Sequence, residues 1–85
     1  PVLIARNMQI EDARQVGADG SHLKLTLTDG WETIDAIAFR MGQFYDELPG
    51  YIDVVFQYET NEFRGNVKRQ MNVQDIKASE DQSGI

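Results

Sequence analysis

Residues that could carry catalysis are few in this 85-residue sequence, and they do not cluster. The single histidine, His22, has no second histidine or nearby nucleophile, which favours a surface strand position over a metal ligand or a catalytic base. Asp35, Asp53 and Asp75 fall in three separate alternating segments, so solvated or hairpin-pairing roles explain them better than a shared cation site. The sequence therefore predicts no catalytic constellation.

Aromatic and cationic side chains offer a different chemistry. Single-stranded nucleic acid is held by aromatic faces, on which bases stack, and by cations that follow the phosphates. Positions 63–69 contain one aromatic residue and three cations. A further cation lies on an alternating segment, and a tryptophan follows a tight turn. The predicted nucleic-acid-binding residues are Lys24, Trp31, Phe63, Arg64, Lys68 and Arg69.

The net charge limits how tightly such a surface could bind. Eight Lys and Arg residues stand against fourteen Asp and Glu residues, which gives a formal net charge of −6. The molecule as a whole therefore repels phosphate, and any contact with nucleic acid must be local. This balance argues against a free-standing, tight DNA binder.

Alternating apolar and polar residues predict strands in most of the chain. The clearest alternation places Leu23, Leu25 and Leu27 on one face. Asp29 and Gly30 then give a strong hairpin signal, which predicts antiparallel pairing with the next strand. The predicted inward-facing residues are Ile4, Met8, Ile10 and Val16, then Leu23, Leu25 and Leu27, then Ile34, Ala36 and Ala38, then Ile52, Val54, Phe56 and Tyr58, and finally Val67, Met71 and Val73.

Residues 39–49 depart from this alternation and repeat at three- and four-residue spacing. They predict a short helix in which Phe44 and Leu48 close the bottom of the core. A phase error at Ala13 and Arg14 predicts a bulge, which would let a long first strand pair on both sides of a barrel.

The element order strand, strand, strand, helix, strand, strand is typical of the oligonucleotide-binding (OB) fold. We therefore predict an all-β, five-stranded Greek-key OB-fold barrel with one short helix between strands 3 and 4. Residues 1–77 form this domain, and residues 78–85 are expected to be a disordered C-terminal tail because they lack periodicity and bulk. Such barrels bind ligands on the outer face of strands 2 and 3, where Lys24 is opposed by Asp35.

The composition also indicates the cellular compartment in which the chain is expected. The chain has no cysteine, which excludes disulfides and thiolate metal sites and makes a reducing cytoplasm the expected location. Its apolar runs are too short to span a membrane. Because the first residue is Pro and a strand begins almost at once, we expect the chain to be a piece of a longer protein.

Several short motifs follow one another between residues 6 and 77. They are Val16 with Gly17, Asp19 with Gly20, residues 22–27, residues 35–39 with Met41 and Gly42, residues 53–56, residues 61–65, and Asp75 with Ile76. In this order and at these spacings, the sequence resembles the OB-fold domain of the bacterial RecJ single-strand-specific exonucleases. One departure is Arg40, which stands where that family more often has Gly.

The resemblance implies a parent enzyme that degrades single-stranded DNA from the 5′ end in recombination and repair. In that family, Asp and His residues of separate catalytic domains hold Mg or Mn. One histidine and no clustered carboxylate motif cannot form a two-metal site, so we expect this chain to be non-catalytic and to hold no cofactor. The expected partners are single-stranded DNA, bound weakly, and the remaining catalytic domains, with the single-strand-binding protein as a further candidate and no membrane.

A structural or protein-interaction barrel, packed against the catalytic core or a partner protein, remains the alternative. On that interpretation Phe63 folds over the barrel rim, and Trp31 packs against the rim. The hairpin cations then balance Glu59 and Glu62 in solvent. A small enzyme is disfavoured because no catalytic constellation is present.

Overall fold

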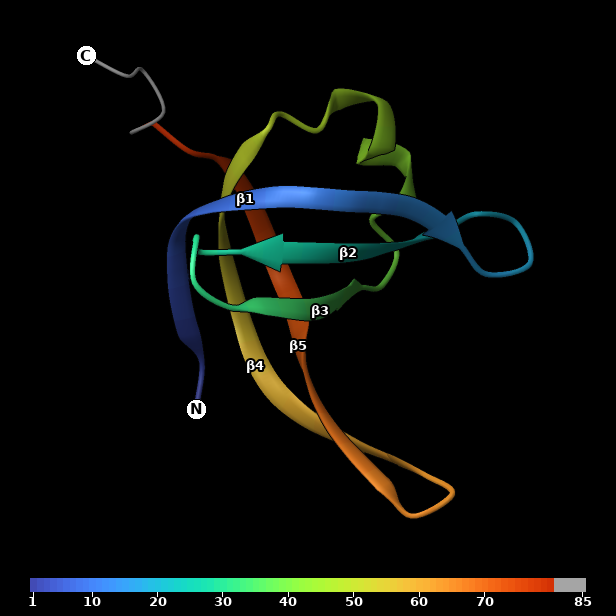
Figure 1. Cartoon of the computed structure of the whole chain (residues 1–85). Coiled ribbons are helices and arrows are strands. Elements are labelled where there is room, and N and C mark those ends of the chain that lie inside the picture. The colour runs from blue at the N-terminus through green and yellow to red at the C-terminus, as the bar shows by residue number, and fades with distance from the viewer. Residues whose placement is uncertain (81–85) are drawn as a thin grey trace.

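Five strands and one short helix succeed one another in the predicted order among residues 1–80, which are the residues that the computed structural model describes (Figure 1). The elements are β1 (Leu3–Val16), β2 (His22–Thr28), β3 (Thr33–Ala38), the 3₁₀ helix η1 (Gly42–Glu47), β4 (Tyr51–Phe63) and β5 (Asn66–Ala78). Within residues 1–80, no helix is both long enough and apolar enough to cross a membrane.

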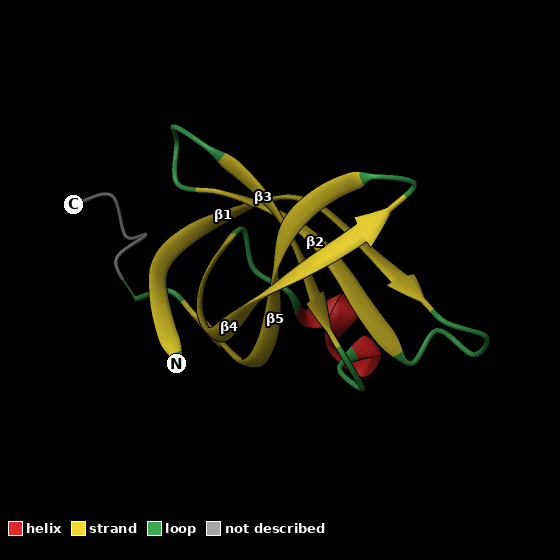
Figure 2. Cartoon of the chain, turned by 90° about the horizontal axis from the view of Figure 1, so that it is seen from below, coloured by secondary structure: helices red, strands yellow, loops and turns green. Residues whose placement is uncertain are grey.

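The strands form a closed barrel in the order β1-β2-β3-β5-β4. Neighbouring strands are antiparallel except β3 and β5, which pair in parallel at Ala36–Met71 and Ile37–Asn72. Figure 2 shows the strands wrapping around the interior, with the helix at the edge of the barrel. The structure is the predicted all-β OB-fold barrel.

The long strand β1 serves both sides of the barrel, pairing with β4 through its first part and with β2 through its second. Its register shifts twice, between Ala5 and Met8 and between Ile10 and Asp12, rather than at the predicted position. Each extra residue reverses which side chains face inward. Ile4 is consequently exposed, contrary to prediction, and Ala5 packs against the core in its place.

Asn7 lies within the first of these irregularities, and its hydrogen bonds hold the irregular backbone in place. Its backbone is left-handed, with φ 56°, and its N–H donates to Asp53 Oδ1 at 2.8 Å. Its side-chain oxygen accepts a hydrogen bond of 2.9 Å from Ser79 Oγ, and the Ser79 N–H donates to the Tyr51 carbonyl at 3.1 Å. Only 4% of Ser79 is exposed.

The ordered barrel therefore continues past residue 77, the last residue of the predicted domain. β5 ends at Ala78, and Ser79 is buried against Asn7. The rest of the expected disordered tail, residues 81–85, lies outside the described residues.

The core gathers inward-facing side chains from every strand. Its buried apolar members are Met8, Leu23, Leu25, Leu27, Ala36, Ala38, Ile52, Val54, Phe56, Met71 and Val73. Ile10, Ile34 and Leu48 pack partly buried against them. The alternation in β2, β3 and the first part of β4 thus predicted the interior well.

Strands β4 and β5 extend beyond the barrel as a two-stranded ribbon. β1 pairs with β4 no further than Leu3–Phe56, and β3 leaves β5 at Met71, so residues 59–70 pair only with each other. We call this segment the projecting ribbon; it forms the lower end of the molecule in Figure 1. Tyr58 and Val67, predicted to face the core, are exposed because the barrel ends beneath them.

The helix is shorter and tighter than predicted. It spans Gly42–Glu47 rather than residues 39–49, and the Gly42 N–H donates to the Ser21 carbonyl at 2.8 Å. Gly42 fits only because it lacks a Cβ, which would collide with the carbonyl oxygen of Gly20. Leu48 packs against the core as predicted, but Phe44 is exposed, because a 3₁₀ turn repeats every three residues and presents it to solvent.

Candidate nucleic-acid interface

The structure separates the six predicted residues into four places. Phe63 and Arg64 lie at the tip of the projecting ribbon, and Lys24 and Lys68 lie on the outer surface of the sheet. Trp31 lies in the loop after β2, and Arg69 lies on the other face of the ribbon, over Tyr58. They do not form one continuous patch.

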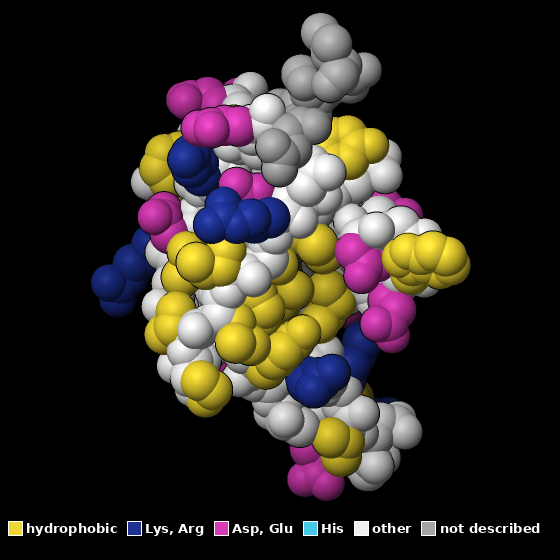
Figure 3. Space-filling view, turned by 90° about the vertical axis from the view of Figure 1, so that its left-hand side faces the viewer, with side chains coloured by type: hydrophobic (Ala, Val, Ile, Leu, Met, Phe, Trp, Pro, Cys, Tyr) yellow, Lys and Arg dark blue, Asp and Glu magenta, His cyan; other side chains and the backbone are white. Residues whose placement is uncertain are grey.

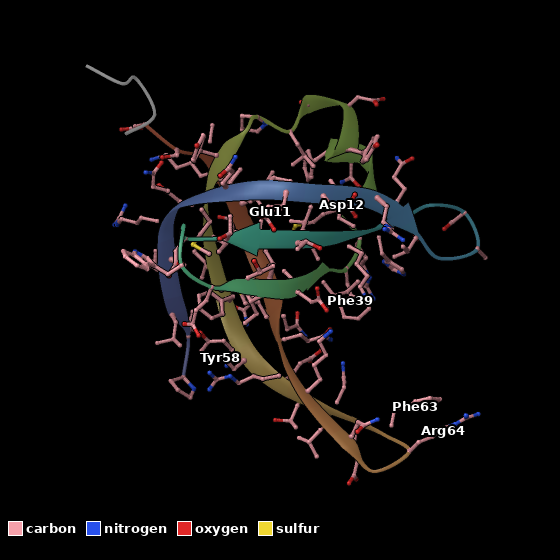
Figure 4. All side chains as sticks on the ribbon, in the orientation of Figure 1. Glu11, Asp12, Phe39, Tyr58, Phe63 and Arg64 are labelled. Carbon is pink, nitrogen blue, oxygen red and sulfur yellow. The ribbon has the colours of Figure 1, made fainter. Side chains whose placement is uncertain are left out.

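The ribbon tip presents an aromatic ring and a cation together. Phe63 is 70% exposed, and the Arg64 guanidinium carbon lies 5.1 Å from the centre of its ring. Figure 4 shows both side chains at the end of the ribbon, away from the barrel. Phe63 therefore does not fold over the barrel rim, and its ring face is available for stacking.

The turn that carries these residues is tight and conformationally costly. Arg64 and Gly65 connect the two strands, and both have positive φ values, 52° and 81°. Such two-residue hairpin turns favour Gly, which has no Cβ, and Asn or Asp, whose short polar side chains tolerate the left-handed backbone, whereas most other residues are strained there. Arginine at this position keeps a long cationic side chain beside Phe63 at the expense of backbone strain.

Lys68 is tied to β3 by an ion pair. Its Nζ lies 2.8 Å from Asp35 Oδ2, with the lysine side chain 73% exposed and the aspartate side chain 26% exposed. A phosphate approaching Lys68 must therefore compete with Asp35. Lys24 makes no ion pair within residues 1–80, and it sits opposite Ile37 rather than opposite Asp35, which pairs with Thr26.

Acidic residues that the sequence pattern did not place here also lie near this outer surface. The second register shift of β1 brings Asp12 opposite Thr26, and the Thr33 hydroxyl donates to the Glu11 carboxylate at 3.5 Å (Figure 4). Asp12 is paired with Arg14 at 3.1 Å. The outer face of β1 and β2 is thus mixed in charge, and Lys24 alone gives it little attraction for phosphate.

Phe39 is an exposed aromatic residue that the pattern missed, since it was assigned to the start of the helix. It follows β3, half of it is exposed, and its ring meets the His22 ring edge to face, with centroids 5.2 Å apart. In Figure 4 it lies on the same side of the molecule as Phe63 and Arg64. His22 is structural here: its Nδ1 accepts the Arg40 N–H at 2.9 Å.

Trp31 stands apart from the ribbon tip. It is 93% exposed, so it does not pack on the rim. Its loop is held by Asp29, whose Oδ1 accepts the N–H of Glu32 at 2.9 Å and that of Trp31 at 2.8 Å. These backbone hydrogen bonds, from Glu32 first and then Trp31, lower the pKa of the Asp29 carboxyl because they stabilise its charged form.

No group of three or more His, Asp or Glu side chains within residues 1–80 is placed to hold a metal ion. What the described surface offers is recognition chemistry: exposed rings for stacking and a few cations for phosphate.

Comparison with known proteins agrees with the fold. The family model described as "RecJ OB domain" matches residues 1–75. The single-stranded-DNA-specific exonuclease RecJ of Bacillus subtilis (strain 168) is 30% identical over 82 residues. That match covers 94% of this chain but only 10% of the relative, so the chain spans about a tenth of the exonuclease's length. The chain belongs to the RecJ OB domain family.

Proposed function

We propose that this domain helps to hold single-stranded DNA for a RecJ-like 5′→3′ exonuclease acting in repair and recombination, without catalysing hydrolysis itself. Hydrolysis and its Mg or Mn are assigned to other domains of the parent protein. The observation that carries the proposal is the exposed Phe63 ring with Arg64 beside it at the end of the projecting ribbon.

The ribbon tip has what a sequence-tolerant contact needs. A base stacks on an aromatic face with about 1 to 3 kcal/mol, whatever its identity. Arg64 adds a cation that can meet a phosphate while covering one side of Phe63. Phe39 is exposed on the same side of the molecule as Phe63 and offers a second ring on which a base of the bound DNA can stack (Figure 4).

The affinity of the isolated chain should be weak. One or two stacked bases amount to a few kcal/mol, and about 4 kcal/mol corresponds to a dissociation constant near 1 mM. The net charge of −6 opposes the phosphates, and Lys68 is occupied by Asp35. Within a longer polypeptide, a high effective concentration makes such a weak contact useful.

The test is a low-salt titration of a fluorescently labelled thymidine oligonucleotide with the chain and with two matched variants. Phe63→Ala should weaken binding by about fivefold or more, the equivalent of at least 1 kcal/mol of stacking. Phe44→Ala removes another exposed phenylalanine, from η1, and should leave binding unchanged. Equal losses in the two variants, or no salt-sensitive binding at all, would contradict the proposal.

A further inference from the structure

One end of the barrel is open and hollow. η1 contacts the residue just before β2, through the hydrogen bond from Gly42 to Ser21, whereas a hollow of about 500 Å³ lies at the other end of β2. It is lined by the first part of β1, by residues of the segment 29–34, and by the base of the projecting ribbon. Met8, Phe56 and Met71 are the buried apolar side chains among its lining. We call this feature the open-end hollow.

Exposed apolar side chains surround the hollow. Figure 3, which faces this side of the molecule, shows hydrophobic side chains gathered at its centre, with Lys and Arg above and below them and Asp and Glu to one side. Leu3, Ile4 and Tyr58 line the hollow and are exposed, and so are two large apolar residues next to lining residues in the sequence, Val2 and Trp31. A soluble domain seldom leaves so many together without a partner.

The residue types at this end are those of protein interfaces. Trp, Tyr and Arg dominate the binding energy of such interfaces, and here they are Trp31, Tyr58 and Arg69. The Arg69 guanidinium carbon stacks 4.3 Å from the centre of the Tyr58 ring. Met8 and Met71 add flexible side chains that can adapt to an inserted group.

The charges at the rim indicate which partner fits. Asp29 and Glu32 line the hollow on the side of the loop after β2, and Arg69 lines it at the base of the projecting ribbon, where its guanidinium is stacked on Tyr58. Within residues 1–80, the unpaired acidic side is therefore the loop after β2. These carboxylates repel the phosphates of DNA. They also repel a second copy of the chain, which carries the same carboxylates and the same net charge of −6. A partner with positive charge beside an apolar group is the complement.

We propose that the open-end hollow docks a segment of a partner protein that presents an aliphatic or aromatic side chain flanked by Lys or Arg. The apolar side chain enters the hollow over Met8, Phe56 and Met71. The flanking cation lies against Asp29 and Glu32. This surface uses different side chains from the ribbon tip, so the inference stands independently of DNA binding.

Trp31 gives a direct readout, because it is the sole tryptophan of the chain and lies in the loop that borders the hollow. The probes are three short synthetic peptides of equal length: leucine alternating with lysine, leucine alternating with glutamate, and serine alternating with lysine. Only the leucine and lysine peptide should bind and shift Trp31 emission to shorter wavelength. A thymidine oligonucleotide serves as the fourth probe and should leave Trp31 emission unchanged.

Two variants separate docking from general attraction to an acidic protein. Leu3→Glu places a charge in the hollow lining, and Phe44→Glu adds the same charge at η1. Leu3→Glu should weaken binding of the leucine and lysine peptide about tenfold, equivalent to about 1.4 kcal/mol, whereas Phe44→Glu should not weaken it. Circular dichroism and thermal melting of both variants test whether they fold.

A third variant, Glu32→Lys, should reduce the preference for the lysine peptide over the glutamate peptide. The inference is overturned if all three variants bind the leucine and lysine peptide as the unaltered chain does, if no peptide shifts Trp31 emission, or if the oligonucleotide produces the same shift. The last result would make this end a nucleic-acid surface.

Discussion

Replacing Asp35 with Asn should increase the affinity of the domain for single-stranded DNA. Asp35 Oδ2 lies 2.8 Å from Lys68 Nζ, so the lysine is neutralised whenever this pair is formed. Because the lysine side chain is 73% exposed, the pair is well solvated, and such pairs are worth about 0.2 to 1 kcal/mol. Releasing Lys68 to a phosphate recovers that amount, which corresponds to about 1.4- to 5-fold tighter binding.

Fluorescence anisotropy of a labelled thymidine oligonucleotide, repeated at several salt concentrations, measures the effect. One additional phosphate contact on a single strand steepens the plot of log affinity against log salt by about 0.7. Asp46→Asn removes the same charge from η1 and controls for net charge. In the double variant Asp35→Asn with Lys68→Ala the gain should disappear. An equal gain in affinity from Asp46→Asn, or a gain in affinity that persists in the double variant, would refute the idea that the ion pair with Asp35 keeps Lys68 from binding phosphate.

Three further predictions concern the turns that position these surfaces. Arg64→Asn should stabilise the domain by about 1 kcal/mol in thermal melting, since Asn tolerates the left-handed backbone. The same variant should weaken DNA binding in the anisotropy assay. Unchanged binding would exclude Arg64 from the interface. Gly42→Ala should destabilise it by about 1 to 3 kcal/mol in chemical denaturation, because the new Cβ meets the Gly20 carbonyl oxygen. The pKa of Asp29 is lowered in the folded chain, so its carboxylate stabilises the Trp31 loop near neutral pH and loses that effect as the pH falls through the lowered pKa. Trp31 fluorescence should therefore change on acidification below about pH 4. Asp29→Asn should abolish that change.

The interior of the barrel could be predicted from the sequence because β2, β3 and the first part of β4, as far as Phe56, alternate without interruption. Leu23, Leu25 and Leu27 are fully buried as expected, and the Asp29–Gly30 turn joins paired strands. The family resemblance drawn from the motifs was confirmed. The local side-chain pattern and the turn residues suffice to predict these strands and this turn, because both depend on residues that are close in the sequence.

Features that depend on pairing between distant strands could not be predicted in the same way. The two irregularities in β1 depend on its pairing with β4 and β2, and they decide that Ile4 faces outward while Ala5 faces inward. The projecting ribbon exists because β1 and β3 stop pairing beneath it, which no alternation within β4 or β5 reveals. Periodicity therefore placed Tyr58 and Val67 in a core that ends before reaching them.

The candidate interface shows the same limit. Phe63 and Arg64 are adjacent in the sequence and remain together in the structure. Arg69 and Lys68, also adjacent, face opposite sides of a strand, one stacking on Tyr58 and the other pairing with Asp35. A cluster of cations in a strand is therefore split between two surfaces, and only the register shows which surface each one serves.

The most direct test of the central claim is the two-dimensional amide spectrum of the ¹⁵N-labelled chain during titration with a thymidine oligonucleotide. We expect salt-sensitive shifts at Phe63, Arg64, Lys68 and Phe39, with the indole N–H of Trp31 unmoved. Shifts confined to Trp31 and the open-end hollow, or no shift anywhere at low salt, would contradict it.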